Sequence, residues 1–187
     1  VKEIIRGYNK IIQEYVNIPV EKINAYIFER NKGYRDKGKY KDGIHVMYPD
    51  VYISTDLQKI IREKFLATCC RIFDKMGLIN RQYKDVVDES IIDRNGWMMY
   101  GSTKVAREPY LITHVFDFQL DDQEIPDDDR YLIEYLSIHN EERPVFEVKE
   151  SKKEELDDFR KPKIIRRDNK LKSGQKFTLP MSRRRPR

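Results

Sequence analysis

The apolar residues near the N-terminus recur with the spacing of an α-helix. In residues 3–16, Ile, Tyr and Val return every three or four positions and line one side of a helix. Pro19 follows, and because proline has no backbone N–H to donate, it marks the end of the periodic segment. The pattern predicts an amphipathic helix at the start of the chain.

A second helical segment has stronger boundary signals. Ser54 and Thr55 are both suitable N-cap residues, and Thr55 with Gln58 fits the pattern of a capping box. The apolar positions that follow form a broad face up to Met76, and Gly77 is suited to ending the helix. These positions are Leu57, Ile60, Ile61, Phe65, Leu66, Cys69, Ile72, Phe73 and Met76. One long helix is expected here.

Short apolar segments elsewhere have the composition and alternation of β-strands. They are residues 23–29, 43–49, 85–92, 96–102 and 110–118. An Asn-Gly pair, which is a strong turn signal, separates the third segment from the fourth. Adjacent strands with few intervening helices are typical of an α+β domain with a mostly antiparallel sheet flanked by helices.

Polar segments separate these elements. Residues 30–42 form a polar loop in this interpretation. The acidic stretch 121–129 leads into a short helix over about 127–138, which Asp127 is suited to cap. Residues 147–159 are charged and compatible with a helix. Little fixed structure is expected after them.

The positive charge of the chain is concentrated at one end. The net charge is +5, but residues 160–187 hold 12 of the 37 Lys and Arg and one of the 32 acids, Asp168. Residues 1–159 therefore carry 25 basic and 31 acidic side chains. The tail suits nucleic acid, through neutralisation of phosphates, or a solvated linker to a following domain. Its candidate contacts are Arg166, Arg167, Lys170, Lys172, Arg183, Arg184 and Arg185.

Several classes of protein are disfavoured by the sequence. With 12 Tyr, 8 Phe and 39% hydrophobic residues, the chain is too apolar to be disordered throughout. No apolar run approaches the length of a transmembrane helix, and the first residues, VKEIIRGYNK, lack the apolar core of a signal peptide. The neighbouring Cys69 and Cys70 favour a reducing compartment. No Walker A loop, zinc-ligand spacing or dinucleotide fingerprint is present.

His45 lies inside one of the predicted strands. In this strand, Ile44 and Val46 alternate with His45 and Met47, so the histidine shares a face with the methionine. One interpretation is a half-exposed strand residue without a function. The other is a side chain directed at a group that needs a proton or a hydrogen bond. His114 and His139 have the same two interpretations.

Asp88 interrupts another predicted strand. A carboxylate on a strand costs desolvation energy unless it has a partner or a metal. One interpretation is a ligand for a hard cation, because Mg²⁺ is usually held by one or two carboxylates together with substrate phosphates. The alternative is an aspartate hydrogen-bonded to a nearby turn.

Residues 100–104 (YGSTK) combine a small-residue turn with a hydroxyl and a lysine. Backbone N–H groups at such a turn, with a lysine nearby, bind phosphate in other proteins. The plainer alternative is the end of a hairpin. Trp97, Met98 and Met99, which precede the turn, are expected in the core rather than in a platform that stacks on bases.

The order of these motifs resembles the archaeo-eukaryotic primase domain. The segments that carry the resemblance are KDGIHVMYPD, then VVDESIIDRNGWMMYGSTK, then YLITHVF and LIEYLSIHN. They are most similar to the primase region of poxvirus-type primase–helicases of large DNA viruses, over residues 1 to about 141. The resemblance implies an RRM-like catalytic core and template-directed nucleotide polymerisation with Mg²⁺ or Mn²⁺.

The resemblance also implies roles for individual residues. Gly43, Ile44 and His45 match the motif whose histidine contacts phosphates of the incoming nucleotide. Asp88 matches the strand acid that binds metal, and its partners in the family are a pair of acids on an earlier strand. Ser102 and Lys104 match positions near the nucleotide. The implied partners are single-stranded DNA, nucleotides and a helicase module of the same polypeptide, at a cytoplasmic site of viral replication without a membrane.

The sequence departs from the family pattern in two places. Residues 1–39 contain no Asp-x-Asp pair on a strand, and Val105 replaces a proline that often follows the lysine of the Gly-Ser turn. Glu29 is a candidate for a second carboxylate. The expected organisation is therefore a partial primase domain at 1–141 whose first acidic motif lies upstream, a charged connector at 142–159 and a basic tail at 160–187. Such a fragment is expected to be inactive alone.

Two other classes of function stay open. One is a non-catalytic module that binds single-stranded nucleic acid through its basic tail, with salt-sensitive affinity that ignores Asp88. The other is an assembly domain in which the acidic 121–129 segment contacts the basic tail of a neighbouring molecule. Such a domain would associate at high protein concentration.

Overall fold

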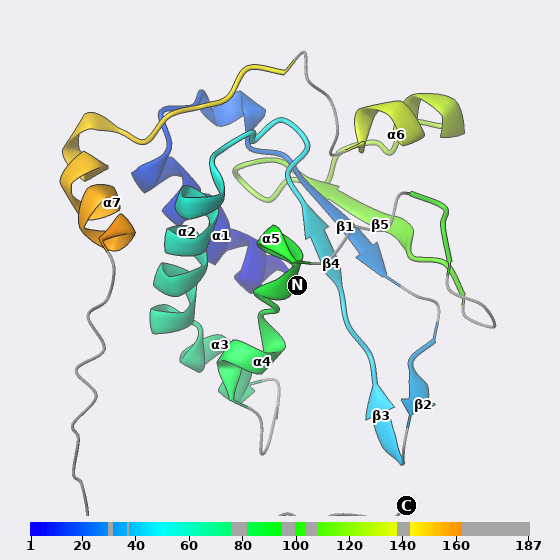
Figure 1. Ribbon diagram of the computed structural model, residues 1–187. Helices are drawn as coiled ribbons and strands as arrows, with labels where there is room; N and C mark the ends of the chain where they lie inside the picture. Colours follow the sequence, from blue (N-terminus) through cyan, green and yellow to red (C-terminus); the bar gives the residue numbers. More distant parts are fainter. Residues whose placement is uncertain are drawn as a thin grey trace, which may run out of the picture.

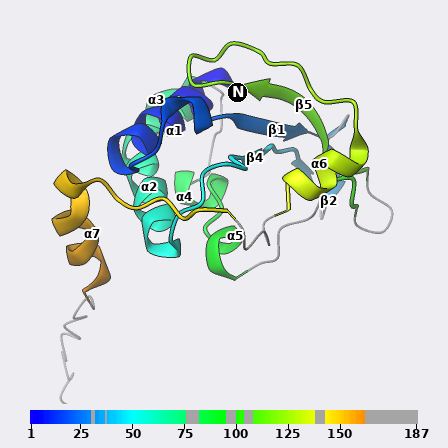
Figure 2. The ribbon, with the colours of Figure 1, turned by 90° about the horizontal axis from the view of Figure 1, so that it is seen from above.

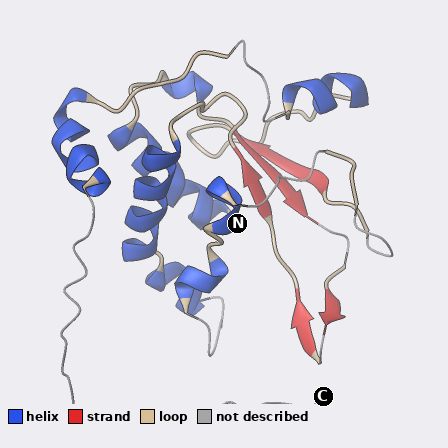
Figure 3. Cartoon of the chain, in the orientation of Figure 1, coloured by secondary structure: helices blue, strands red, loops and turns tan. Residues whose placement is uncertain are grey.

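An antiparallel sheet lies between two groups of helices in the computed structural model, which describes residues 1–29, 32–36, 38–75, 82–94, 100–103, 108–137 and 143–161 (Figure 1). The α+β class expected from the sequence is confirmed (Figure 3). The strands are β1 (Ala25–Glu29), β2 (Tyr34–Asp36), β3 (Lys39–Lys41), β4 (His45–Met47) and β5 (Leu111–Phe116). The helices are α1 (Lys2–Tyr15), η1 (Val20–Lys22), α2 (Thr55–Thr68), α3 (Cys70–Lys75), α4 (Tyr83–Val86), α5 (Ser90–Asp93), α6 (Asp129–Tyr135), η2 (Glu150–Lys152) and α7 (Lys153–Arg160).

Strand β1 is the centre of the sheet. The strand order is β4-β1-β5, and both neighbours pair with β1 in the antiparallel sense (Figure 2). The predicted strands at 23–29, 43–49 and 110–118 are thus confirmed. Because β1 is apolar at successive positions, it buries both of its faces, as central strands do.

The two faces of the sheet have different neighbours. Ala25 and Ile27 pack with Ile5 of α1, and we call this side the inner face. Tyr26 and Phe28 pack with Leu132 of α6, and we call this side the outer face. Helices α1 and α2 are thus separated from α6 by the sheet (Figure 1).

Helices α1 and α2 pack closely on each other. The rings of Tyr8 and Phe65 stack with centroids 4.2 Å apart. A Cβ at Gly7 would lie 2.8 Å from the Phe65 ring, so this contact requires the glycine. The Ser54 hydroxyl caps α2 by accepting a hydrogen bond from the Leu57 N–H. The expected single long helix is interrupted at Cys69, which is fully buried, and Gly77 lies outside the described residues.

A buried asparagine connects three parts of the fold. Asn9 of α1 is 2% exposed, and its amide Nδ2 donates to the carbonyl of Phe118 at 3.2 Å. Its Oδ1 accepts from the hydroxyl of Tyr48, just after β4, at 2.9 Å. Burial raises the pKa of the Tyr48 hydroxyl well above its ordinary value, so this group stays a donor. The amide therefore fixes α1 to the ends of both outer strands.

The predicted strand at 85–92 is wrong. The segment forms the short helices α4 and α5, and Asp88 lies between them. The carboxylate Oδ1 accepts from the backbone N–H and the hydroxyl of Ser90, at 2.9 and 2.7 Å. This local bonding of an aspartate competes with strand pairing, and the apolar alternation gave no sign of it.

Two smaller expectations also need correction. The polar loop at 30–42 contains a two-stranded hairpin, β2–β3, with Gly38 at φ +77° in the turn between them. Helix α6 begins one residue later than expected, because Asp128 rather than Asp127 accepts from the Tyr131 N–H, at 3.0 Å. None of the helices in the described ranges combines the length and apolarity that crossing a membrane requires.

The segment 143–161 lies along the helical layer. The Val148 backbone forms a bridge with Val16, and the Glu147 carbonyl accepts from the Asn17 N–H at 2.9 Å. Leu156 of α7 is buried in the same cluster as α1 and α2. The Tyr15 hydroxyl donates to Glu155 at 2.8 Å. The sequence predicted a charged and partly helical connector here, and the segment forms η2 and α7. Through Leu156 it also contributes to the hydrophobic core.

Replacing Asn9 with alanine is expected to destabilise the domain by about 2–4 kcal/mol, because the Tyr48 hydroxyl and the Phe118 carbonyl would lose their buried partner. Urea unfolding followed by circular dichroism measures this change. Asn24→Ala is the control, because the hydrogen bond from the Asn24 amide to the Glu21 carbonyl is exposed, and it should change stability by less than about 0.5 kcal/mol. Equal effects of the two substitutions would contradict the role of the buried amide.

Truncating Leu156 to alanine is expected to cost about 2–5 kcal/mol, because it leaves a cavity between α7 and α2. Val145→Ala is the matched control, since Val145 is 66% exposed and should tolerate the change. The same unfolding experiment measures both variants. A Leu156→Ala protein as stable as the wild type would show that α7 is not part of the cooperative unit.

Candidate functional site

His45 is the first residue of β4 and lies on the outer face. It pairs with Phe28 in the β1–β4 register, which places it at the C-terminal end of β1. Its ring stacks on Tyr110 with centroids 3.9 Å apart and planes at 23°. The side chain is half-buried. The predicted alternation is confirmed, because Val46 packs on the inner face while Met47 packs on the outer one.

The turn at residues 100–103 reaches the same face. Tyr100 contacts Phe28 edge-on, with centroids 6.4 Å apart, and Phe28 is the partner of His45 in the register. Gly101 follows at φ +75°, a left-handed conformation that favours glycine. Ser102 comes next, so this turn is anchored near the strand that carries His45. Two predicted motifs far apart in the sequence are therefore brought to one side of the sheet.

Gly43 has no structural requirement for glycine. A Cβ at this position would meet no atom within 4 Å, and its φ lies outside the left-handed region. The Gly43 N–H donates a hydrogen bond to the carboxylate of the preceding Asp42, at 2.8 Å. The residue is exposed just before β4. The backbone here is accessible to a ligand that approaches His45.

Asp88 is held by a different part of the fold. It lies in the α4–α5 segment and is exposed. The two hydrogen bonds from Ser90 lower the pKa of the Asp88 carboxyl, and the charge of Arg62 lowers it further. The carboxylate is therefore ionised at neutral pH. Its second oxygen, Oδ2, has no hydrogen bond or ion pair with the described residues.

A divalent ion fits Asp88 as a single ligand only. An ionised carboxylate with one oxygen to spare suits a hard cation that also binds substrate phosphates. Within the described ranges, no cluster of three or more His, Cys, Asp or Glu is placed to hold a metal. Glu29, the candidate second carboxylate, accepts from the Thr113 hydroxyl at 2.6 Å and alternates with Phe28, so it is not on the outer face with His45.

Several predicted residues cannot be placed. Lys104, Val105, Trp97, Met98, Met99 and His139 lie outside the described residues, as do Arg166, Arg167, Lys170, Lys172, Arg183, Arg184 and Arg185. His114, the remaining histidine, alternates onto the inner side of β5. Its Nδ1 lies 3.1 Å from the Asp122 carboxylate.

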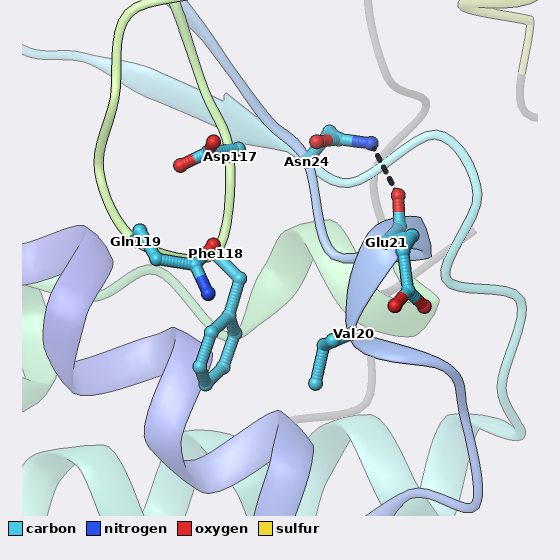
Figure 4. Close-up of a pocket in the computed structure, with 6 residues that line it drawn as sticks. All are labelled: Val20, Glu21, Asn24, Asp117, Phe118 and Gln119. Atoms are coloured by element: carbon cyan, nitrogen blue, oxygen red, sulfur yellow. Dashed lines mark hydrogen bonds between the residues drawn. The ribbon is translucent and has the colours of Figure 1, made fainter.

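A cavity of about 300 Å³ lies at the other end of the sheet (Figure 4). It is bounded by Val20, Glu21, Asn24, Asp117, Phe118 and Gln119. These residues precede β1 and follow β5, whereas His45 is opposite the C-terminal end of β1. The cavity is therefore separate from the predicted site.

The sequence interpretation missed two groups near the site. Tyr110 was assigned only to a strand, yet its ring covers His45. Arg62 was not considered, yet it contacts the segment that holds Asp88. A charged residue among the apolar positions of a buried helix was a detectable signal for Arg62. No sequence signal existed for Tyr110, because its contact depends on strand pairing.

Comparisons with known proteins give a consistent result. Residues 1–116 match a family model described as the N-terminal AEP domain of the C962R protein. A putative helicase, L207/L206, of Acanthamoeba polyphaga mimivirus is 34% identical over 119 residues, which are 62% of this chain. The aligned part is 12% of that much longer protein, so the chain corresponds to about an eighth of its length.

Replacing Gly43 with alanine should leave stability unchanged or raise it by up to about 1 kcal/mol, because the added methyl meets open space and restricts the unfolded chain. Gly101→Ala is the matched comparison. It should cost about 1–2 kcal/mol, since its φ is positive. Thermal unfolding of both variants distinguishes the two positions. A strong loss of stability in Gly43→Ala would show that the fold itself needs this glycine.

Proposed function

The chain belongs to the AEP (archaeo-eukaryotic primase) family of the C962R type, and from this premise we propose that it forms the nucleotide-binding part of a viral primase–helicase. The supporting observation is that His45 and the 100–103 turn share the outer face of the sheet. These are the motifs expected to contact the phosphates of an incoming nucleotide. The primase assignment thus combines family membership with a plausible arrangement of these residues.

The chain's own residues would act mainly by positioning the nucleotide. Stacking on Tyr110 limits the rotation of the His45 ring, and in this proposal the imidazole would donate to a phosphate oxygen of the bound nucleotide. Ser102, two residues after Tyr100, would add a hydroxyl donor. Gly43 lets the phosphates approach the backbone closely. Such fixed donors stabilise negative charge without reorganising during the reaction.

Asp88 would be one ligand of the Mg²⁺ or Mn²⁺ that the family uses. When bound, such an ion supplies positive charge that offsets the charge of the phosphates. The other acids of the site would come from the family's first acidic motif, upstream of residue 1. We therefore expect residues 1–187 alone to bind metal weakly and to synthesise no primers.

The remaining parts of the proposal concern the parent polypeptide. A helicase module of the same polypeptide would act with this domain, as the name of the mimivirus relative suggests. The basic tail at 160–187 would contact single-stranded DNA through its phosphates. The site of action would be the cytoplasm of an infected cell, a reducing compartment in which Cys69 and Cys70 stay free thiols.

A second candidate is a non-catalytic module that binds single-stranded nucleic acid. The observation that favours it is that the Asp88 carboxylate bonds locally to Ser90, while the described ranges hold no cluster of three or more His, Cys, Asp or Glu placed to bind a metal. In this alternative the basic tail would supply the affinity. Binding would weaken steeply with salt and would ignore His45 and Asp88.

Primer synthesis on a single-stranded template tests the proposal. The 187-residue chain is compared with the parent viral polypeptide, using labelled nucleotides and Mg²⁺ or Mn²⁺. We expect activity in the parent protein alone, lowered at least about 100-fold by Asp88→Ala or His45→Ala. Asp85→Ala and His114→Ala are the matched controls. Asp85 lies in α4, three residues before Asp88, and His114 lies on β5 and on the inner side of the sheet, so neither belongs to the proposed site.

Two outcomes would count against the proposal. An inactive parent protein whose tight, salt-sensitive DNA binding survives both substitutions would leave the binding module as the function. Equal losses in the test and control variants would show that stability, not a specific site, was affected. In either case His45 and Asp88 would have no place in catalysis.

A further inference from the structure

Arg62 is a charged side chain in a buried position. It lies on α2 and is 8% exposed, among neighbours such as Ile61 and Phe65 that form the hydrophobic core. Burying a guanidinium is costly unless its donors are paired. An apolar residue at this position of the helix would be easier to accommodate. The partners of Arg62 therefore indicate why a charge is present there.

All three nitrogens of the guanidinium bind one short segment. Nε donates to the Val87 carbonyl at 2.9 Å, and Nη2 donates to the Lys84 carbonyl at 3.0 Å. Nη1 lies 3.3 Å from a carboxylate oxygen of Glu89. Val87 and Glu89 are the direct neighbours of Asp88, and Lys84 lies four residues before it. The arginine thus holds the backbone just before the proposed metal ligand and the side chain of the residue just after it.

Apart from Arg62, the segment is held by Tyr83 and Val87, which pack against the hydrophobic core, and by the Tyr83 hydroxyl, which donates to Asp74. Helices α4 and α5 have four residues each, which is too short for either to be stable by itself. Lys59, one turn before Arg62, forms an ion pair with Asp93 at 2.6 Å and so holds the far end of α5. Only Arg62, among the described side chains of α2, donates to the backbone around Asp88.

The shape of the side chain matters as much as its charge. Binding two carbonyls and a carboxylate at once requires the planar, forked guanidinium. A lysine would keep the charge but would present a single ammonium group. Fixing the backbone before Asp88 and the side chain of Glu89 after it restricts the direction of the Asp88 side chain. This is the task that outer-sphere groups perform for metal ligands in other proteins.

We propose that Arg62 is a positioning residue that holds the Asp88 carboxylate in place for the divalent ion of the nucleotide site. The inference rests on the proposed function, in which Asp88 is a metal ligand. It adds a residue on a different helix, 26 positions earlier in the chain, that contacts neither nucleotide nor metal. Its effect reaches the site through the Lys84, Val87 and Glu89 contacts.

Mn²⁺ binding in the presence of a nucleoside triphosphate tests this inference in the parent polypeptide. Titration followed by water-proton relaxation gives the affinity without requiring catalysis. Arg62→Lys should weaken Mn²⁺ binding by about 10-fold or more, the usual effect of losing an outer-sphere group. Lys59→Met is the matched control, because it removes the ion pair with Asp93 but no contact to the Asp88 backbone. It should change the Mn²⁺ affinity by less than about twofold.

A second measurement reports on the segment itself. The Ser90 N–H donates to Asp88, so its hydrogen exchange in the 187-residue chain monitors how well this pair is held. Arg62→Lys should accelerate exchange at Ser90 while the amides of α2 remain protected. If Arg62→Lys fails to fold, Glu89→Gln takes its place, because Glu89 is largely exposed and only its ion pair is lost. Its expected effect on Mn²⁺ affinity is up to about fivefold.

The outcomes separate the two proposals. If Asp88→Asn leaves Mn²⁺ binding unchanged, Asp88 is not a metal ligand, and both the proposed site and the role of Arg62 are wrong. If Asp88→Asn abolishes binding but a folded Arg62→Lys or Glu89→Gln protein binds Mn²⁺ as the wild type does, only the positioning role is wrong. Equal weakening by Arg62→Lys and Lys59→Met would also overturn it, because both would then act through general stability.

Discussion

Strand β1 has no face exposed to solvent, and this constraint organises the whole domain. Its inner side chains need α1 to cover them, and its outer side chains need α6. Strands β4 and β5 both pair with β1, and neither pairs with another of the described strands, although Phe116 of β5 also forms an isolated bridge with Asp122. A slip of one residue in either pairing would exchange inner for outer side chains. The position of His45 opposite Phe28 is therefore fixed by the burial of β1.

The two principal candidate residues are supported in physically different ways. His45 is held by strand pairing and by the stacked ring of Tyr110, so its position depends on the core. Asp88 lies on an exposed segment that is connected to the core through the hydrogen bonds of Arg62. The proposed site would thus combine His45, a phosphate-binding side chain held rigidly by the core, with Asp88, which is held by contacts of its own segment. Substitutions in the helical layer would therefore displace the Asp88 side chain more than the His45 side chain.

The sequence was informative where burial determined the structure. The first helix, the three paired strands and the outward alternation of His45 all follow from apolar periodicity, because each element buries a continuous face. The strand expected around Asp88 failed because a side chain bonding to its own backbone leaves no periodic trace. Likewise, the pairing of Tyr110 with His45 depends on which strands become neighbours, and a single sequence does not encode strand order in any local pattern. The candidate site could be identified by motif, but its supporting residues could not.

The contacts of residues 143–161 also affect how the protein folds during synthesis. The Tyr15 hydroxyl bonds to Glu155, a separation of 140 residues, and Leu156 completes the cluster that covers α1. A ribosome that adds about 5–20 residues per second needs roughly 7–30 seconds to make the intervening chain. Throughout that interval the apolar side of the first helix lacks its final cover. The nascent chain therefore exposes an apolar surface for longer than a domain built from local contacts would.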